Sequence, residues 1–160
     1  MNELPRTFKV VTVWLLLGTG LFLAVQAWLA DRQRARFQAD GMGVVELRRA
    51  PDGHFHWPAR VNGRAVEFLV DTGATRSALP GPMAERLGLE RQGEVRSSTA
   101  GGVVQGWEAR VDLALEGGLQ AERLRVTVLP GLAAPLLGMD VLSRLHFSQQ
   151  DGVLRLEPLR

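Results

Sequence analysis

Residues 68–75 read FLVDTGAT, and this stretch decides how the rest of the sequence is interpreted. An apolar run, typical of a buried β-strand, leads directly into an acid, a hydroxyl residue and a glycine. By itself this ending is ordinary, because Asp and Gly are common where a strand turns. A second apolar pair followed by glycine, Leu136-Leu137-Gly138, lies about 65 residues downstream, beyond a segment with a glycine-rich turn. This recurrence favours a functional role for the first stretch.

Most of the sequence has the pattern of β-hairpins. Gly and Asn tolerate the positive φ of tight turns, and such dipeptides separate runs that alternate with period two. Along residues 107–115, apolar side chains share one face and charged ones the other. Two short helices are expected, one between Pro82 and Gly88 and one over 139–145. The fold is therefore expected to be mainly β, with turns at Asn62-Gly63, Gly101-Gly102, Gly117-Gly118 and Asp151-Gly152.

An uncharged apolar segment, residues 10–30, precedes the hairpins. As a helix it would rise about 1.5 Å per residue, enough to cross a hydrocarbon core of about 30 Å. Trp14 and Trp28 lie towards its two ends, where indole rings favour the membrane interface. We interpret the segment as a single transmembrane helix. The alternatives are a cleaved signal peptide, with Val-Gln-Ala at 25–27 as its cleavage site, and a buried core helix.

The segment that follows the apolar run is polar and mixed in charge. Its arginines, Arg32, Arg34 and Arg36, are either solvated or in contact with anionic lipid headgroups. Basic residues flank both ends of the apolar segment, so charge alone does not fix its topology. The expected layout is a tail at 1–9, a transmembrane helix at 10–30, a linker at 31–42 and one folded domain at 43–160.

Composition excludes several classes of function. The chain has no Cys, which excludes a disulfide framework, a thiolate metal site and a Cys nucleophile. Beyond residue 30 it has 17 Arg against 16 acidic residues, spread evenly, so no basic footprint for a nucleic acid is present. The sequence also lacks a Gly-x-Ser-x-Gly elbow and a phosphate-binding loop. His54 and His56 alternate on one strand face without an obvious third ligand, so no metal site is expected.

Taken together, these pieces resemble the retropepsin-like aspartic proteases, most closely the small bacterial branch with an N-terminal membrane anchor. Two positions depart from the family pattern: Met139, where viral relatives often have Arg, and Asp140, which many bacterial relatives lack. The matching stretches extend over about 54–158 and are VNGRAVEFLVDTGATRSALP (61–80), AERLGL (84–89), the flap-like STAGGVVQGW (98–107), PLLGMDVLSRLHF (135–147) and DGVLRLEP (151–158).

The resemblance implies a closed β-barrel and hydrolysis of peptide bonds without a cofactor. In this chemistry two aspartates share one proton: the ionised one activates water, and the protonated one polarises the scissile carbonyl. The sequence contains a single Asp-Thr-Gly, at 71–73. One chain therefore carries half of the dyad, and we expect a homodimer in which each copy contributes Asp71.

The same resemblance assigns supporting roles. Thr72 would hydrogen-bond across the dimer axis, and Gly73 would donate its backbone N–H to the carboxylate. A flap would close over an extended peptide substrate, and residues 153–156 would supply a dimer-interface strand. The expected site is Asp71 with Thr72, Gly73 and Ala74, the flap residues Ala100, Gly101 and Gly102, and Leu137 and Gly138 packed beside the Asp71 loop.

Other readings stay open at this point. Asp140 could be taken for the second catalytic carboxylate, but we favour a role at the start of a helix, where an acid meets the positive end of the dipole. The alternative to an endopeptidase is a non-catalytic peptide-binding or scaffold domain with the same fold. The resemblance implies a bacterial inner-membrane protein with the protease domain in the periplasm.

Overall fold

The computed structural model describes residues 6–33, 36–39, 41, 43–99 and 102–159. The chain divides into two compact units, Met1–Arg34 and Ala35–Arg160. The elements are α1 (Arg6–Gln33), β1 (Arg36–Gln38), β2 (Val45–Arg48), β3 (His56–Val61), β4 (Arg64–Val70), β5 (Ala78–Pro80), α2 (Gly81–Arg86), β6 (Gly93–Thr99), β7 (Gly102–Leu115), β8 (Gln120–Leu129), β9 (Leu136–Leu137), α3 (Met139–Leu142), β10 (Leu145–Gln150) and β11 (Val153–Pro158).

Helix α1 makes up the first unit and is apolar along most of its length. Its segment Val10–Leu29 has a mean hydropathy of 2.0, and no part of that segment is buried in protein. Large side chains such as Trp14 and Leu21 are about two-thirds exposed or more, at 70% and 68%. A helix of 20 residues with this composition matches a membrane span or a signal sequence, and among the described residues it is the one helix that does so.

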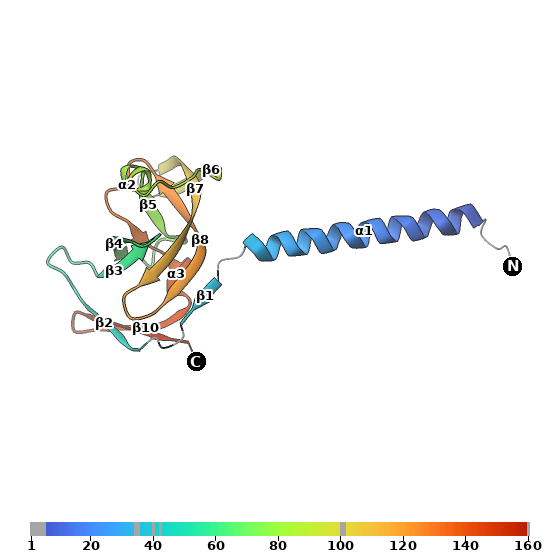
Figure 1. Ribbon diagram of the computed structural model, residues 1–160. Coiled ribbons are helices and arrows are strands. Elements are labelled where there is room, and N and C mark those ends of the chain that lie inside the picture. The colour runs from blue at the N-terminus through green and yellow to red at the C-terminus, as the bar shows by residue number, and fades with distance from the viewer. Residues whose placement is uncertain (1–5, 34–35, 40, 42, 100–101, 160) are drawn as a thin grey trace. The chain divides into compact units, whose positions relative to one another are not determined.

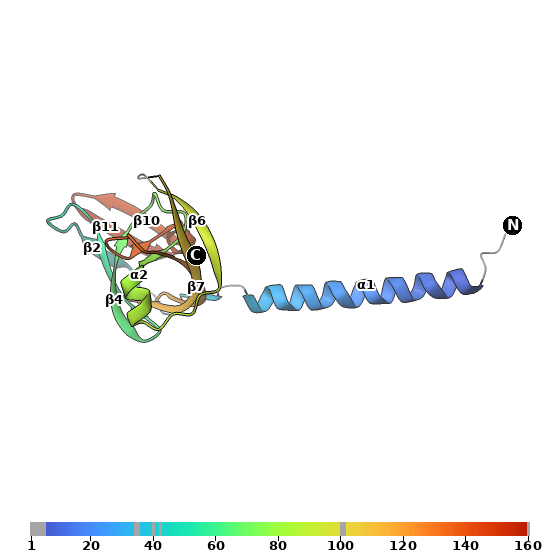
Figure 2. The same cartoon turned by 90° about the horizontal axis from the view of Figure 1, so that it is seen from above.

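The second unit is built on a closed β-barrel (Figures 1 and 2). The strand order of its eight-stranded sheet is β1-β8-β5-β9-β4-β3-β7-β6, and β7 also pairs with β8. This additional pairing joins β8, β5, β9, β4, β3 and β7 into a ring, with β1 and β6 added outside it. The expected mainly β, closed-barrel fold is therefore confirmed.

Local turn chemistry forms the hairpins. Three expected turns join paired strands: Asn62-Gly63 joins β3 to β4, Gly117-Gly118 joins β7 to β8, and Asp151-Gly152 joins β10 to β11. All of these turn residues have positive φ, between 49° and 107°. The fourth expected turn includes Gly101, which lies outside the described residues. Strands β6 and β7 pair as far as Thr99 and Gly102 on either side of it.

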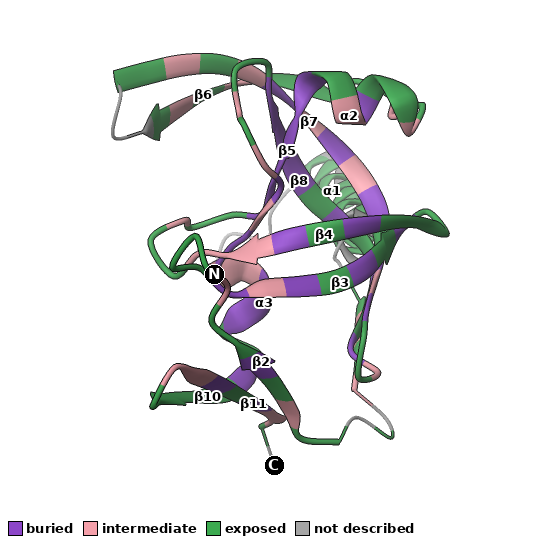
Figure 3. Ribbon diagram, turned by 90° about the vertical axis from the view of Figure 1, so that its left-hand side faces the viewer, coloured by how far each residue is buried: buried purple, intermediate pink, exposed green. Residues whose placement is uncertain are grey.

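The period-two alternation predicted from the sequence places one face of each strand in the core. In β7 the residues Trp107, Ala109, Val111, Leu113 and Leu115 are all buried. Figure 3 shows the same alternation of buried and exposed positions along β3 and β4. Trp57 of β3 is fully buried, and its indole N–H donates to the Glu116 carbonyl over 2.8 Å. That bond lets a large polar-edged ring lie in the core without an unsatisfied donor.

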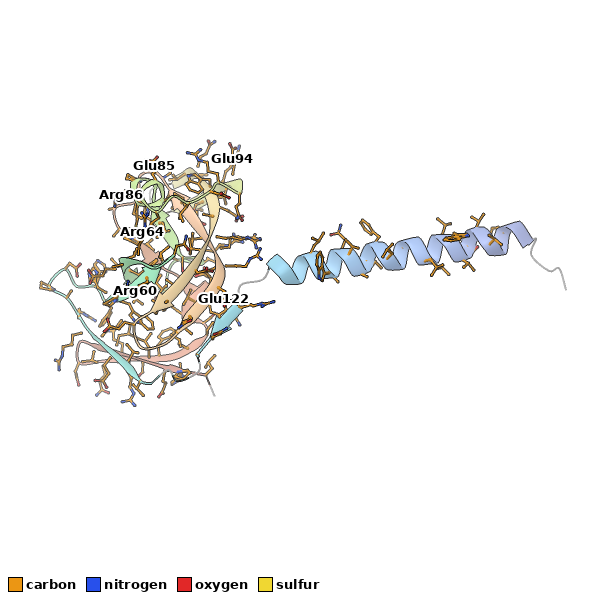
Figure 4. The ribbon with its side chains drawn as sticks, in the orientation of Figure 1. Arg60, Arg64, Glu85, Arg86, Glu94 and Glu122 are labelled. Atoms are coloured by element: carbon orange, nitrogen blue, oxygen red, sulfur yellow. The ribbon has the colours of Figure 1, made fainter. Side chains whose placement is uncertain are left out.

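Helix α2 confirms the first predicted helix. Its N-cap is Pro80, a proline stands in its first turn, and Gly88 beyond its end has a φ of +67°. The guanidinium of Arg64 on β4 donates to the Arg86 carbonyl at the end of the helix, and Figure 4 shows these two residues close together. The short helix is therefore fixed to the barrel at its C-terminus, where carbonyls lack helical partners.

A second sheet of three strands has the order β10-β11-β2. Residues Val153–Leu156 of β11 pair with β10 on one side and with β2 on the other. Residues 153–156, expected to supply a dimer-interface strand, therefore have backbone partners on both sides within their own chain. The two edge strands of this sheet are β10 and β2, and residues 146–150 of β10 are all exposed.

Two further expectations are corrected by the structure. The helix expected over 139–145 ends at Leu142, and Leu145 begins β10 as a buried strand residue. The segment 31–42, expected to be a linker, contains β1, which pairs antiparallel with residues 120–122 of β8. Phe37 of β1 packs against the core and lies 4.8 Å from the guanidinium carbon of Arg144. The folded unit therefore starts before residue 43.

Candidate active site

The Asp71 loop lies beside the second strand-then-glycine stretch of the sequence. Strand β4 pairs in parallel with β9, with Leu69 opposite Leu136 and Val70 opposite Leu137. Because parallel strands end on the same side, the residues that follow β4 and β9 come together. The Asp71 N–H continues the pairing by donating to the Leu137 carbonyl over 3.0 Å.

The Asp71 carboxylate is held by its own loop. The Gly73 N–H donates to Asp71 Oδ1 over 2.8 Å, and the Ala74 N–H donates to the Asp71 carbonyl over 3.3 Å. A Cβ added at Gly73 would lie 3.2 Å from Asp71 Oδ1, so glycine permits this close approach. Asp71 is half-buried, whereas Thr72 and Gly73 are exposed. The loop thus presents one oriented carboxylate at the surface of the barrel.

Next to this loop, a partly buried hydrogen-bond network joins residues 74–77 to residues 138–140. The Ser77 hydroxyl donates to Asp140 Oδ1 over 2.8 Å, and the Ser77 N–H donates to the same oxygen over 3.0 Å. The Gly138 N–H donates to Ser77 Oγ over 3.1 Å. Two backbone bonds extend the network: Met139 N–H to the Ala74 carbonyl at 2.8 Å and Asp140 N–H to the Thr75 carbonyl at 3.2 Å.

Sequence reasoning missed Ser77. It is fully buried, and its carbonyl also accepts the Thr127 N–H from β8. The signal for it was weak, because a hydroxyl residue just before an apolar strand is common in loops. Only the three-dimensional neighbour, Asp140, distinguishes Ser77 from an ordinary turn residue.

Asp140 lies in the first turn of α3, as the sequence predicted, but its side chain is committed to Ser77. Its second oxygen, Oδ2, is buried and has no hydrogen-bond partner among the residues that the structure describes. Burial raises the pKa of the Asp140 carboxyl above its ordinary value, and the hydrogen bonds from Ser77 oppose that rise. Asp140 therefore joins the first turn of α3 to the segment that follows the Asp71 loop.

Gly138 is required by the close approach of the two segments. A Cβ at this position would lie 2.5 Å from the Arg76 carbonyl carbon and 2.9 Å from the Ala74 carbonyl oxygen. These are backbone atoms, which cannot rotate away, so any larger residue would separate the segments. Leu137, next to it, is fully buried in the core.

The β6–β7 hairpin occupies the position expected for the flap. Of the three predicted tip residues, Ala100 and Gly101 lie outside the described part of the chain, and Gly102 is exposed with a φ of +110°. Val103 next to it is 71% exposed. Strand β6 pairs with β7 on one side and forms an edge of the sheet on the other.

The histidines noted in the sequence form part of a surface turn. Asp52 accepts the His54 N–H over 2.9 Å, and its other oxygen lies 2.7 Å from His56 Nε2. These hydrogen bonds, the backbone one first, lower the pKa of Asp52. Among the described residues, no group of three or more His, Cys, Asp or Glu side chains converges on a point where a metal ion could bind.

Comparisons with known proteins agree with this geometry. The family described as "gag-polyprotein putative aspartyl protease" matches residues 57–144. An uncharacterised Sinorhizobium protein, encoded in the cobV 5′ region, is 33% identical over 116 residues, covering 69% of this chain and 50% of that protein. The Gag-Pol polyprotein of gibbon ape leukemia virus is 38% identical over 85 residues, covering 53% of this chain and 5% of the polyprotein. The match thus spans half the length of the Sinorhizobium relative and a small part of the viral polyprotein.

A solved structure shows the same fold. The crystal structure of a retropepsin-like aspartic protease from Rickettsia conorii is 25% identical, has a TM-score of 0.58, and is covered over 92% of its chain and 77% of this one. The family match extends across both halves of the site, the Asp71 loop and the Gly138 segment. On these grounds the chain belongs to the retropepsin-like family of aspartic proteases.

Proposed function

We propose that this chain is an aspartic endopeptidase whose active site forms between two copies of it. The observation that carries the proposal is the half-buried Asp71 carboxylate, oriented by Gly73 at the end of β4. The sequence has one Asp-Thr-Gly, whereas attack of water on an amide without a metal or a covalent intermediate needs both a general base and a general acid. A second copy related by twofold symmetry supplies the other carboxylate.

In the proposed reaction the two Asp71 carboxyls share one proton, because two close carboxylates cannot both ionise easily. The ionised carboxylate takes a proton from water, which attacks the scissile carbonyl. The protonated carboxyl polarises that carbonyl and then gives its proton to the leaving amine. Thr72 is exposed next to Asp71 and available to bond across the dimer axis. The Ser77–Asp140 network keeps the loop that carries the acid in place.

The substrate is proposed to be an extended peptide segment. The open edge of β6 offers backbone donors and acceptors to such a segment, which would bind as an added strand. The flap tip, with Ala100, Gly101 and Gly102, is proposed to close over the peptide and exclude water.

For the dimer, the second sheet supports an interface through β10. This strand lies at the sheet edge, and its residues from His146 to Gln150 are exposed on both faces. Phe147 is 36% exposed, an apolar side chain that a second copy would cover. Pairing of two β10 edges would leave β11 and β2 unchanged.

We further propose that α1 is a membrane anchor of the bacterial inner membrane, with the protease domain in the periplasm. The exposed apolar segment Val10–Leu29 supports the anchor. On this proposal the chain consists of a tail at 1–9, a transmembrane helix at 10–30 and the protease domain, with a linker shorter than 31–42. Restriction to a membrane raises the local concentration of copies and so favours a weak dimer.

The test compares Asp71→Asn with Asp151→Asn in the full chain, reconstituted in detergent or vesicles. Asp151 is the matched control, because it lies in an exposed turn at positive φ, which Asn also adopts readily. The substrate is a mixture of peptides from a protein digest, and the products of cleavage are identified by mass spectrometry. We expect Asp71→Asn to lose cleavage by at least about a thousandfold and to keep its thermal transition, and Asp151→Asn to match the wild type. A scaffold domain would show no cleavage in any of the three proteins, and that result would refute the proposal.

A further inference from the structure

A cavity of about 530 Å³ lies on one face of the β6–β7 hairpin, next to Pro130. The strand register places Glu94 opposite Trp107 and Arg96 opposite Gln105. Because side chains alternate along a strand, these four share one face, and all of them line the cavity. Trp107 is buried, whereas the three polar side chains are exposed. Figure 4 shows Glu94 at the surface of the molecule. The cavity thus has an aromatic floor and a polar rim.

Two guanidinium groups dominate the charge of this rim. The Arg91 guanidinium lies 5.2 Å from the centroid of the Trp107 ring, which holds it over the floor. Arg96 extends from β6 itself and lines the same cavity. Within the part of the chain that the structure describes, neither arginine is paired with a carboxylate. Of the described residues that line the cavity, Glu94 is the one acid, so the rim has an excess of positive charge that suits a carboxylate ligand.

The cavity lies alongside the open edge of a sheet. Most of its β6 side comes from consecutive residues, Gly93 to Arg96, and among the described strands β6 pairs with β7 alone. A peptide that adds to β6 as a further strand therefore runs past the two arginines. Arg96 lies three residues before Thr99, the last residue of β6, which is about 10 Å along a strand. Of the two arginines, Arg96 is therefore the first that the peptide meets as it runs away from that end of β6.

We propose that this cavity is an exosite that selects peptide substrates with acidic side chains remote from the scissile bond. Arg96 and Arg91 bind the side chain of an Asp or Glu residue of the substrate. Along the substrate, that residue lies three or more positions from the one next to the end of β6. Glu94 opposes this binding by repulsion. The inference rests on the proposed function for its biological use, but the binding itself does not require cleavage.

The experiment uses the full chain with the change Asp71→Asn, so that peptides bind without being cut. Fluorescent peptides carry one constant apolar core, flanked on both sides by Glu, Gln or Lys, and binding is measured by fluorescence anisotropy at low and high salt. We expect the Glu peptide to bind about threefold to tenfold more tightly than the Gln peptide at low salt, with the Lys peptide weakest. The preference should shrink as salt rises.

Three further changes make the test specific to the cavity. In the same background, Arg96→Gln combined with Arg91→Gln should remove the preference for Glu, and Glu94→Gln should increase it about threefold. Arg48→Gln is the control for loss of an exposed arginine away from the cavity, because Arg48 lies on β2 in the other sheet. It should leave the preference unchanged.

The outcomes separate the exosite from the proposed function. Equal affinities for Glu and Gln peptides, no binding of the Glu peptide, or a preference that survives loss of both arginines would each overturn the exosite. With wild-type Asp71, the same peptides should show the preference in KM and not in kcat, since the contact is remote from the reacting atoms. If wild-type protein cuts none of them while the anisotropy preference is present, the protease assignment fails and the acidic-peptide site stands.

Discussion

The hydroxyl of Ser77 donates to the carboxylate of Asp140 over 2.8 Å, across 63 residues of sequence. This contact joins the end of the Asp71 loop to the first turn of α3. Together with the Gly138 N–H bond to Ser77 Oγ, it fixes the position from which Asp71 is presented. We therefore expect the position of the Asp71 loop to depend on Ser77 and Asp140 as well as on the loop's own residues.

Replacing Asp140 with Ala should destabilise the fold substantially. Ser77 would lose the acceptor of both its N–H and its hydroxyl inside a buried region, and we expect unfolding free energy to fall by about 2–4 kcal/mol. Asp140→Asn keeps an oxygen for Ser77 and should cost about 1 kcal/mol or less. Urea unfolding followed by tryptophan fluorescence measures both. Equal losses in the two variants would show that the Ser77 contact contributes little.

The pH dependence of stability should also change with Asp140. Burial raises the pKa of this carboxyl above its ordinary 3.8, so the folded state holds the proton more tightly than the unfolded state. The stability linked to that proton is present at low pH and is lost as pH rises through the raised pKa. As pH falls from about 7 to about 4, we expect the unfolding free energy of the wild type to rise relative to that of Asp140→Asn. Thermal transitions of both proteins across this range would show it, and a constant difference would contradict it.

Gly138→Ala should be far more damaging than an alanine at another glycine. The new Cβ would meet the Arg76 backbone at 2.5 Å, and the Asp71 loop would have to shift. We expect a loss of about 3 kcal/mol or more and loss of peptide cleavage. Gly131→Ala is the control, since no atom lies within 4 Å of its added Cβ and its φ is not positive. Similar transitions for the two variants would argue against close packing at Gly138.

Mixing wild-type and Asp71→Asn chains tests the shared dyad. If two copies build one site and exchange freely, an equal mixture contains about one quarter wild-type pairs. Activity per total protein should then fall to about one quarter of the pure wild type. Dilution with an unrelated membrane protein should lower it only to about one half. A value of one half with the Asp71→Asn chain would mean that each copy acts alone.

Shortening the chain tests both the anchor and β1. A chain of residues 35–160 retains β1 and should unfold at the same urea concentration as the full chain, because the two units are separate. A chain of residues 41–160 lacks the β1–β8 pairing and Phe37, and we expect its unfolding free energy to be lower by about 1–2 kcal/mol. On dilution, both short chains should lose specific activity, whereas the full chain in vesicles should not. Equal dilution behaviour would exclude a role for α1 in assembly.

Much of the fold followed from local features of the sequence. The pairs Asn62-Gly63 and Asp151-Gly152 predicted their hairpins, because positive φ at consecutive residues has few other uses. Alternation along 107–115 predicted which face is buried, since a pleated strand has a period of two. The DTGA stretch predicted where the candidate acid lies, at the end of a buried strand.

The sequence by itself determined the hairpins, the buried faces, the apolar α1 segment and the single acid at 71, since each is set by residues a few positions apart. Only the tertiary structure decided the parallel β4–β9 pairing, the Ser77–Asp140 contact, the central place of β11 and the attachment of β1 to β8. These join segments tens of residues apart, and their partners are selected by closure of the barrel and burial of a common core. No local pattern encodes that choice.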